Sequence, residues 1–329
     1  MNDNLFDPRF GKRPALFAGR DDVLRDIRAA LYDPEEQERV TILSGIKGSG
    51  KSAILAEVRS EAGKGGFVFT EPLRDGEIPE ALSSGSGNGA AMVYIIDDAK
   101  MDMPGLNDFL TDFSQRVHAG KDIRLILAGL PHDIEEILKE DKFSYLRRAG
   151  RISLGNLHTD EVLALFTEAF EELNTESGHE EKTDQTRESV LRRASDATDG
   201  YPYMVQLVGY YLSKEKNLDD KSVDKAIFLA KIELYKNVHG PITGGLSSKD
   251  RMFLWAMSQD EGRSEFGEIA KRMDVSTGYA SKYRERLINA GVIYSSGYGE
   301  LAFTLPFMKE YIEKEFIERL GGEGGKRRL

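Results

Sequence analysis

The sequence predicts a chain that begins as an α/β protein with a parallel sheet, continues with helices only, and ends in a winged helix-turn-helix. Three observations predict this order. Apolar runs typical of buried parallel strands alternate with helical patterns up to residue 154. From residue 159 to residue 235 apolar residues recur only at helical spacing. Beyond residue 248 three short helices precede a hairpin with glycines at its tip.

The overall composition is that of an ordinary globular protein and excludes several classes of function. The chain has 329 residues, of which 40% are hydrophobic and 31% charged, so we expect two or three domains. The absence of cysteine excludes disulfides and thiolate metal sites and fits a reducing cytoplasm. No apolar run is long enough to cross a bilayer, and the first residues resemble no signal peptide. A net charge of -11 argues against nonspecific nucleic-acid binding, although a local basic face remains possible.

The N-terminal segment leads irregularly into a first helix. Pro14 and Gly19 fall in a loop-like stretch that ends at Arg20, after which Asp21 and Asp22 begin a pattern of helical apolar spacing. Such a lead could lie over the base and ribose of a nucleotide, with Arg20 helping to close the pocket. The alternative is a plain N-terminal helix preceded by a capping turn.

A phosphate-binding loop organises the chain. Residues 45–52 match the pattern G-x-x-x-x-G-K-[ST], follow the β-branched run 40–43 and precede a helix that starts at Ala53. Glycines in such a loop let backbone N–H groups surround phosphates, the lysine adds positive charge, and the serine hydroxyl binds Mg²⁺. The predicted nucleotide-binding residues here are Gly45, Gly48, Ser49, Gly50, Lys51, Ser52 and Ala53.

Two carboxylates end the next buried strand, residues 92–96. Asp97 and Asp98 would lie at the edge of the sheet where α/β folds bind ligands. We expect Asp97 to join Ser52 in holding Mg²⁺ and Asp98 to orient the attacking water, with Lys51 on the phosphates. The alternative is an Asx-type turn after a core strand.

Further elements complete three folded parts. We expect a strand at 66–70, a surface connection at 82–90, a helix at 105–118 and strands at 122–129 and 151–154, in a parallel, doubly wound core over residues 1–155. Helices at 160–173, 186–198, 203–213 and 220–235 would form a lid over residues 156–240. After a linker at 240–245, a winged helix would occupy residues 246–320, followed by a flexible tail at 321–329.

These pieces together resemble the AAA+/STAND class of P-loop ATPases, and most closely the bacterial and archaeal ATPases related to origin-recognition initiators. The motifs that carry the resemblance are Phe17-Ala18-Gly19-Arg20-Asp21-Asp22, the phosphate loop, Ile95-Ile96-Asp97-Asp98, Ala128-Gly129-Leu130-Pro131, Gly200-Tyr201-Pro202 and the C-terminal winged helix. The resemblance implies ATP or ADP with Mg²⁺ as cofactors, a lid that closes over the base, and Pro202 near the adenine.

Three departures from the family pattern bear on turnover. Many active members end the acidic strand in Asp-Glu, whereas Asp98 is one methylene shorter and reaches less far toward water. Ala128 stands where relatives place a polar sensor and cannot form a hydrogen bond. The arginine that relatives insert into a neighbour's site would be Arg147 or Arg148, with Arg148 preferred, unless both are surface residues. The sequence therefore favours a slow nucleotide-dependent switch.

The target of the winged helix is left open by the sequence. Its third helix carries Thr277, Lys282, Arg284 and Arg286, which suit duplex DNA, but Glu285 interrupts the basic run. One hypothesis is an ATPase that couples its nucleotide state to DNA or to assembly, possible homo-oligomers included. The other is a signalling or defence-type regulator that binds a protein partner. A small-molecule kinase is disfavoured by the winged helix, and the five scattered histidines suggest neither a metal site nor a catalytic triad.

Overall fold

The computed structural model describes residues 5–9, 15–17, 19–32, 39–60, 67–71, 73, 91–177 and 184–324. The chain divides into two compact units, Met1–Ala230 and Lys231–Leu329. The predicted surface connection at 82–90 lies outside the described residues. No described helix is long and apolar enough to cross a membrane.

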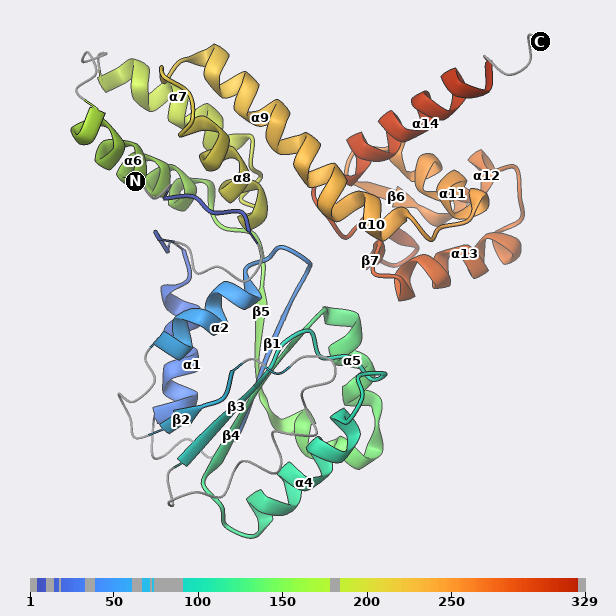
Figure 1. Ribbon diagram of the computed structural model, residues 1–329. Helices are drawn as coiled ribbons and strands as arrows, with labels where there is room; N and C mark the ends of the chain where they lie inside the picture. Colours follow the sequence, from blue (N-terminus) through green and yellow to red (C-terminus); the bar gives the residue numbers. More distant parts are fainter. Residues whose placement is uncertain are drawn as a thin grey trace. The chain divides into compact units, whose positions relative to one another are not determined.

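The first unit is built on a five-stranded sheet of order β2-β3-β4-β1-β5 (Figure 1). All its pairings are parallel. The strands are β1 (Val40–Gly45), β2 (Phe67–Phe69), β3 (Ala91–Ile96), β4 (Ile123–Gly129) and β5 (Gly150–Leu154). Every residue of β4 is buried, and all but Arg124, which pairs with Asp122 at 2.6 Å, are apolar or glycine, as expected for a central parallel strand. Because β4 lies between β1 and β3, it separates the strand that leads into the phosphate loop from the strand that ends in Asp97.

Helices cover both faces of this sheet, as expected for a doubly wound core. One face packs against α1 (Asp21–Tyr32) and α2 (Lys51–Ser60), through a cluster that includes Ile27 and Leu55. The other face packs against α4 (Leu106–His118), α5 (Pro131–Lys139) and the 3-10 helix η1 (Asp141–Arg148), through a cluster that includes Phe109 (Figure 1). The carboxyl ends of β1, β3 and β4 therefore meet at one open edge.

Four further helices follow the sheet, and we call them the lid. They are α6 (Thr159–Ser177), α7 (Asp184–Asp196), α8 (Pro202–Leu212) and α9 (Asp220–Leu234). The four predicted helices are thus present, most with ends shifted by one or two residues. Residues 178–183, between the first two helices, lie outside the described residues, and α7 begins at Asp184, two residues before the predicted start at 186.

The N-terminal residues pack against the lid, which the sequence analysis did not anticipate. The buried Phe6 ring lies 5.6 Å from the Phe166 ring and 6.1 Å from the Phe170 ring. A Cβ atom at Gly209 of α8 would fall 2.4 Å from the Phe6 ring, so only glycine admits the ring there. The Asp7 N–H also donates to Gln206 Oε1 at 3.0 Å. Residues assigned in advance to the core are therefore part of the lid's packing.

The second unit has an element order compatible with a winged helix-turn-helix. It contains α11 (Ser248–Ser258), β6 (Arg263–Glu265), α12 (Phe266–Arg272), α13 (Thr277–Asn289), β7 (Ile293–Gly297), β8 (Glu300–Phe303) and α14 (Met308–Gly324). Its antiparallel sheet has the order β6-β8-β7.

Two boundaries in this unit differ from the prediction. The expected linker at 240–245 begins as helix, since α9 continues through a π-helical turn, η2 (Tyr235–His239), into α10 (Gly240–Thr243). Pro241 is tolerated because it occupies the first turn of α10. The helix α14 extends to Gly324, so the tail expected from residue 321 begins in helix; its last five residues lie outside the described part of the chain.

Candidate functional site

The phosphate loop joins β1 to α2 with a backbone that only glycine adopts readily. Gly48 and Gly50 have φ angles of 78° and 95°, in the left-handed region. The Ser49 N–H donates to the Ile46 carbonyl at 3.2 Å, and the Ile54 N–H to the Gly50 carbonyl at 3.0 Å, which opens α2. Ser49 Oγ is buried and has no hydrogen-bond partner among the described residues. The loop therefore has the curvature that turns N–H groups toward an anion, and it contains an unpartnered hydroxyl.

Lys51 lies inside this curve. Its side chain is buried, and Nζ donates to the carbonyl oxygens of Gly45 at 2.8 Å and Ile46 at 3.1 Å. Burial lowers the pKa of Lys51, while the nearby carboxylates of Asp98, Asp97 and Asp133 oppose that shift. A cation thus lies between the loop and the acidic end of β3, where an anionic ligand would be attracted.

Ser52 and Asp97 come together as the sequence predicted. Ser52 Oγ donates to Asp97 Oδ2 at 3.0 Å, although the two residues are 45 positions apart. Asp97 is fully buried at the end of β3, and its other oxygen accepts the Asp98 N–H at 3.1 Å. A hydroxyl and a carboxylate at this separation are the oxygen ligands that Mg²⁺ prefers, with phosphate and water completing its shell. Among the described residues, no group of three or more His, Cys, Asp or Glu could hold a metal alone.

Asp98 follows with a left-handed backbone, with φ at 56°. Its side chain is exposed, whereas that of Asp97 is buried. The next residue, Ala99, donates its N–H to the Ala128 carbonyl at 2.8 Å, which fixes the acidic turn against the end of β4. This geometry leaves the Asp97 carboxylate buried and the Asp98 carboxylate exposed to solvent.

Ala128 is buried beside Leu43 of β1, so the position expected for a polar sensor is apolar. Polar groups appear immediately after it, where α5 begins. Asp133 interacts electrostatically with Lys51; burial raises the pKa of Asp133, and the nearby His132, with Nδ1 3.7 Å from Asp133 Oδ1, opposes that rise. Neither His132 nor Asp133 was among the site residues predicted from the sequence. Their relevance follows from the strand order, since β4 lies between β1 and β3.

Arg20 bridges the phosphate loop and the residue that follows β5. Its Nη2 donates to the Gly155 carbonyl at 2.6 Å and, more weakly, to the Ser49 carbonyl at 3.4 Å. Partial burial lowers the pKa of Arg20, and Glu161 opposes that shift. The expectation that Arg20 lies at the pocket is consistent with these contacts, and both of them are made to backbone.

The Gly200-Tyr201-Pro202 turn also reaches the phosphate loop. Pro202 occupies the first turn of α8. The buried Tyr201 donates its hydroxyl to the Lys47 carbonyl, and burial raises the pKa of this phenol. A Cβ atom at Gly48 would lie 2.2 Å from the Tyr201 hydroxyl oxygen. From the sequence, Tyr201 was predicted only as the middle residue of the Gly200-Tyr201-Pro202 motif. The signal that could have indicated its contact with the phosphate loop is the aromatic side chain at this position.

Arg147 and Arg148 differ in their surroundings. Arg147 donates to the carbonyls of Leu138 at 2.9 Å and Lys139 at 3.2 Å, and it pairs with Asp141 at 3.0 Å, so it caps the end of α5. Arg148 is exposed and makes no hydrogen bond or ion pair with the part of the chain that the structure describes. Of the two arginines, Arg148 is the one available to a neighbouring molecule.

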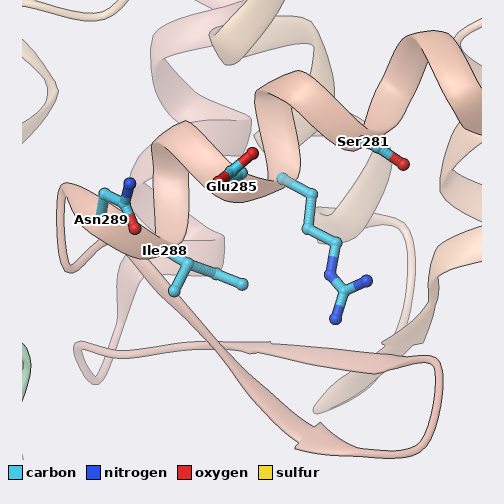
Figure 2. A pocket seen from close by; sticks show the side chains of 5 residues that line it. Ser281, Glu285, Ile288 and Asn289 are labelled. Carbon is cyan, nitrogen blue, oxygen red and sulfur yellow. The ribbon is translucent and has the colours of Figure 1, made fainter.

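The exposed face of α13 was the predicted nucleic-acid surface. Ser281, Glu285, Ile288 and Asn289 line a shallow pocket along it together with Arg284 (Figure 2). The four predicted residues have different surroundings: Thr277 is exposed at the start of the helix, Lys282 Nζ lies 3.9 Å from the Tyr279 ring centre, Arg284 packs 5.3 Å from the Phe266 ring centre, and Arg286 Nε donates to Asp250 at 2.9 Å.

Arg286 is part of the second unit's own framework. It pairs with the buried Asp250, whose carboxylate completes a capping box with Ser247 at the start of α11. These contacts lower the pKa of Asp250 against the opposing effect of burial. Arg286 is exposed but already paired, whereas Thr277 and Lys282 are exposed and form no ion pair with the described residues.

One family model matches the C-terminal part of the chain. A family model described as a domain of unknown function, DUF8462, matches residues 236–312, from the π-helical turn to the start of α14. No curated protein matches the chain.

Solved structures match almost the whole chain at low identity. The Walker-type ATPase paby2304 of Pyrococcus abyssi superposes with a TM-score of 0.68 at 16% identity, covering 94% of this chain and 99% of that one. The ORC2 protein of Aeropyrum pernix, in ADPNP-ADP complexes, superposes with a TM-score of 0.64 at 13% identity, covering 96% and 100%. The resemblance to AAA+ ATPases of the origin-recognition kind is thus confirmed at the level of the fold.

Proposed function

We propose that this chain binds ATP with Mg²⁺ at the phosphate loop and hydrolyses it slowly, as a nucleotide-dependent switch. The observation that carries the proposal is the Ser52 to Asp97 hydrogen bond of 3.0 Å beside a buried Lys51. Two separate motifs thereby converge on one Mg²⁺-phosphate site. The Pyrococcus protein's designation as a Walker-type ATPase and the ADPNP-ADP complexes of the Aeropyrum protein support the same ligand.

Each residue then has a distinct role. Gly45, Gly48, Ser49, Gly50 and Ala53 supply the backbone of the phosphate cradle, and Lys51 balances the phosphate charge. Ser52 and Asp97 hold Mg²⁺, which when bound would neutralise charge that develops on the phosphates. Asp98 orients the attacking water from its exposed position. Pro202 lies at the N-terminus of α8, near the base.

Turnover is slow because the polar contacts around the γ-phosphate are few. The side chain of Ala128 cannot form a hydrogen bond with the γ-phosphate or water, and the short Asp98 reaches less far than a glutamate would. We assign to Arg148 the role of completing the site of a neighbouring copy, because it is exposed and not engaged within the described chain. Activity would then depend on nucleotide-dependent self-association.

The second unit transmits the nucleotide state to a target, either DNA or a protein. DNA is favoured by the exposed Lys282 and Thr277, and basic residues slightly outnumber acidic ones in residues 231–329 although the whole chain is acidic. A protein partner, as in the signalling or defence-type alternative, is favoured by Glu285 in the α13 pocket and by the fully exposed Tyr298 at the hairpin tip.

ATP turnover against protein concentration tests the ATPase proposal. Wild type should release phosphate slowly, and Lys51→Ala should bring the rate to the blank. A rate per subunit that rises with concentration, and a loss of that rise in Arg148→Ala but not in Lys139→Ala, would support a site shared between copies. Turnover in Lys51→Ala equal to wild type would contradict the assigned site.

Salt-dependent binding to duplex DNA separates the two targets. Lys282→Ala and Arg284→Ala should weaken binding and flatten its salt dependence if α13 contacts phosphates, whereas Lys225→Ala in the lid should not. Absence of binding at low salt with either nucleotide would exclude the DNA target and favour the protein partner.

A further inference from the structure

Two carbonyl groups of the phosphate loop are held by side chains from outside the loop. Tyr201, from the turn that precedes α8, donates to the carbonyl of Lys47. Arg20, from the lead into α1, donates to the carbonyl of Ser49. The two contacts are separated by one peptide unit, and they approach from segments 181 residues apart in the sequence. This arrangement is independent of the Mg²⁺ ligands.

The planar peptide bond links the direction of each of these carbonyls to that of the next residue's N–H group. In a trans peptide the carbonyl and the following N–H point in opposite directions. A hydrogen bond that holds the Lys47 carbonyl toward Tyr201 therefore aims the Gly48 N–H away from Tyr201. The contact from Arg20 does the same for the Gly50 N–H. Gly48 and Gly50 carry the positive φ angles that curve the loop, and their N–H groups belong to the cradle that would surround phosphates.

The backbone that carries Tyr201 is itself rigidly placed. Gly200 has a φ angle of 63°, and a Cβ atom there would fall 2.0 Å from the Leu157 carbonyl oxygen. The Leu157 N–H donates to the Gly200 carbonyl at 2.8 Å, and the Tyr201 N–H to the Thr198 carbonyl at 3.0 Å. At the other end of the side chain, Gly48 leaves room for the hydroxyl because it lacks a Cβ. The phenol is thus fitted between two glycines.

We propose that Tyr201 and Arg20 are positioning residues that preorient the phosphate-binding N–H groups of Gly48 and Gly50. These two side chains thereby set the affinity of the loop for polyphosphate, whatever base is attached. This inference rests on the proposed nucleotide site and adds to it a polyphosphate-specific function of Tyr201 and Arg20.

The test measures the affinity of the full chain for ATP, ADP, inorganic tripolyphosphate and adenosine, by titration calorimetry with Mg²⁺. Loss of one neutral hydrogen bond predicts that Tyr201→Phe weakens ATP, ADP and tripolyphosphate by a similar factor of about 2 to 12, and leaves adenosine unchanged. Tyr210→Phe, in the helix α8 that follows Tyr201, is the matched control, because the Tyr210 hydroxyl makes no hydrogen bond within the described residues. Arg20→Gln perturbs the other carbonyl and should produce the same ligand pattern.

The outcomes are distinguishable. Weaker ATP binding by Tyr201→Phe with unchanged tripolyphosphate binding would place the effect on the base and overturn the inference, as would unchanged binding of all ligands in both variants. If Tyr201→Phe fails to fold, as judged by thermal denaturation, Arg20→Gln decides by the same criterion. Equal ATP affinity of Lys51→Ala and wild type would instead refute the proposed nucleotide site.

Discussion

Lowering the pH from 7.5 to 5.0 should remove about 2 kcal/mol from the unfolding free energy of the second unit through one side chain, His239. His239 is fully buried, stacks on Tyr311 with ring centres 5.3 Å apart, and shares a hydrogen bond of 2.9 Å between Nε2 and the Pro306 carbonyl. Its Nδ1 has no partner among the described residues. Burial lowers the pKa of His239 to about 4, although the Pro306 carbonyl and Glu310 oppose the shift.

The sign and size follow from proton linkage. In the unfolded chain the pKa of histidine is about 6.5, so below that pH the unfolded state binds more protons than the folded state. The stability that His239 contributes by staying neutral in the folded state is therefore fully present above about pH 6.5. It is lost as the pH falls toward the folded pKa of about 4. At pH 5.0 the unfolded state is favoured about 30-fold by this group, which is about 2 kcal/mol.

The single tryptophan makes the measurement specific to this unit. Trp255 of α11 stacks on Phe316 of α14 at 4.6 Å, so its fluorescence reports unfolding of the second unit within the full chain. Urea titrations at pH 7.5 and 5.0 would compare wild type with His239→Gln, which keeps a donor for the Pro306 carbonyl but does not titrate. His132→Gln, in the first unit, is the control. An equal pH dependence in wild type and His239→Gln would refute the reasoning.

Three further predictions concern stability. Gly200→Ala should destabilise the first unit by about 3 kcal/mol, because it places an alanine in the left-handed region and its Cβ would clash with the Leu157 carbonyl. A loss of less than about 0.5 kcal/mol in thermal denaturation would contradict the close approach of residue 200 to that carbonyl. Asp250→Ala should cost about 2 kcal/mol in the Trp255 urea transition, because the capping box and the pair with Arg286 are both lost, and an unchanged midpoint would count against this. Arg147→Ala should lower stability by about 1 kcal/mol whereas Arg148→Ala stays within about 0.5 kcal/mol; calorimetric melting curves with the reverse order would show that the wrong arginine caps α5.

Local patterns in the sequence were enough to predict the sheet and the phosphate loop. Buried strands are predominantly apolar over several consecutive residues, and the glycines at 48 and 50 are needed for positive φ, so both features can be recognised from short stretches of sequence. The meeting of Ser52 with Asp97 was also predictable, because parallel strands place their carboxyl ends at one edge. The specific roles of these residues stay predictions.

Contacts between distant segments could not be predicted in the same way. The hydrogen bond from Tyr201 to Lys47 spans 154 positions, and no periodicity records it. His132 and Asp133 gained meaning only when the order of the strands placed β4 in the middle. The linker at 240–245 was wrong in its first residues because glycine and proline suggested a break, whereas Pro241 fits the first turn of a helix. Arg286 belonged to a basic run in the sequence, but its partner Asp250 lies on another helix.

The burial of Phe6 between α6 and α8 changes how the lid is attached to the core. The chain touches the lid at residues 6 and 7, passes through the whole sheet, and returns to the lid after β5. The sheet is thus inserted, along the chain, between two segments that both belong to one helical body. Phe6 therefore adds a packed anchorage near the start of the chain to the hydrogen bond by which Tyr201 holds the phosphate loop.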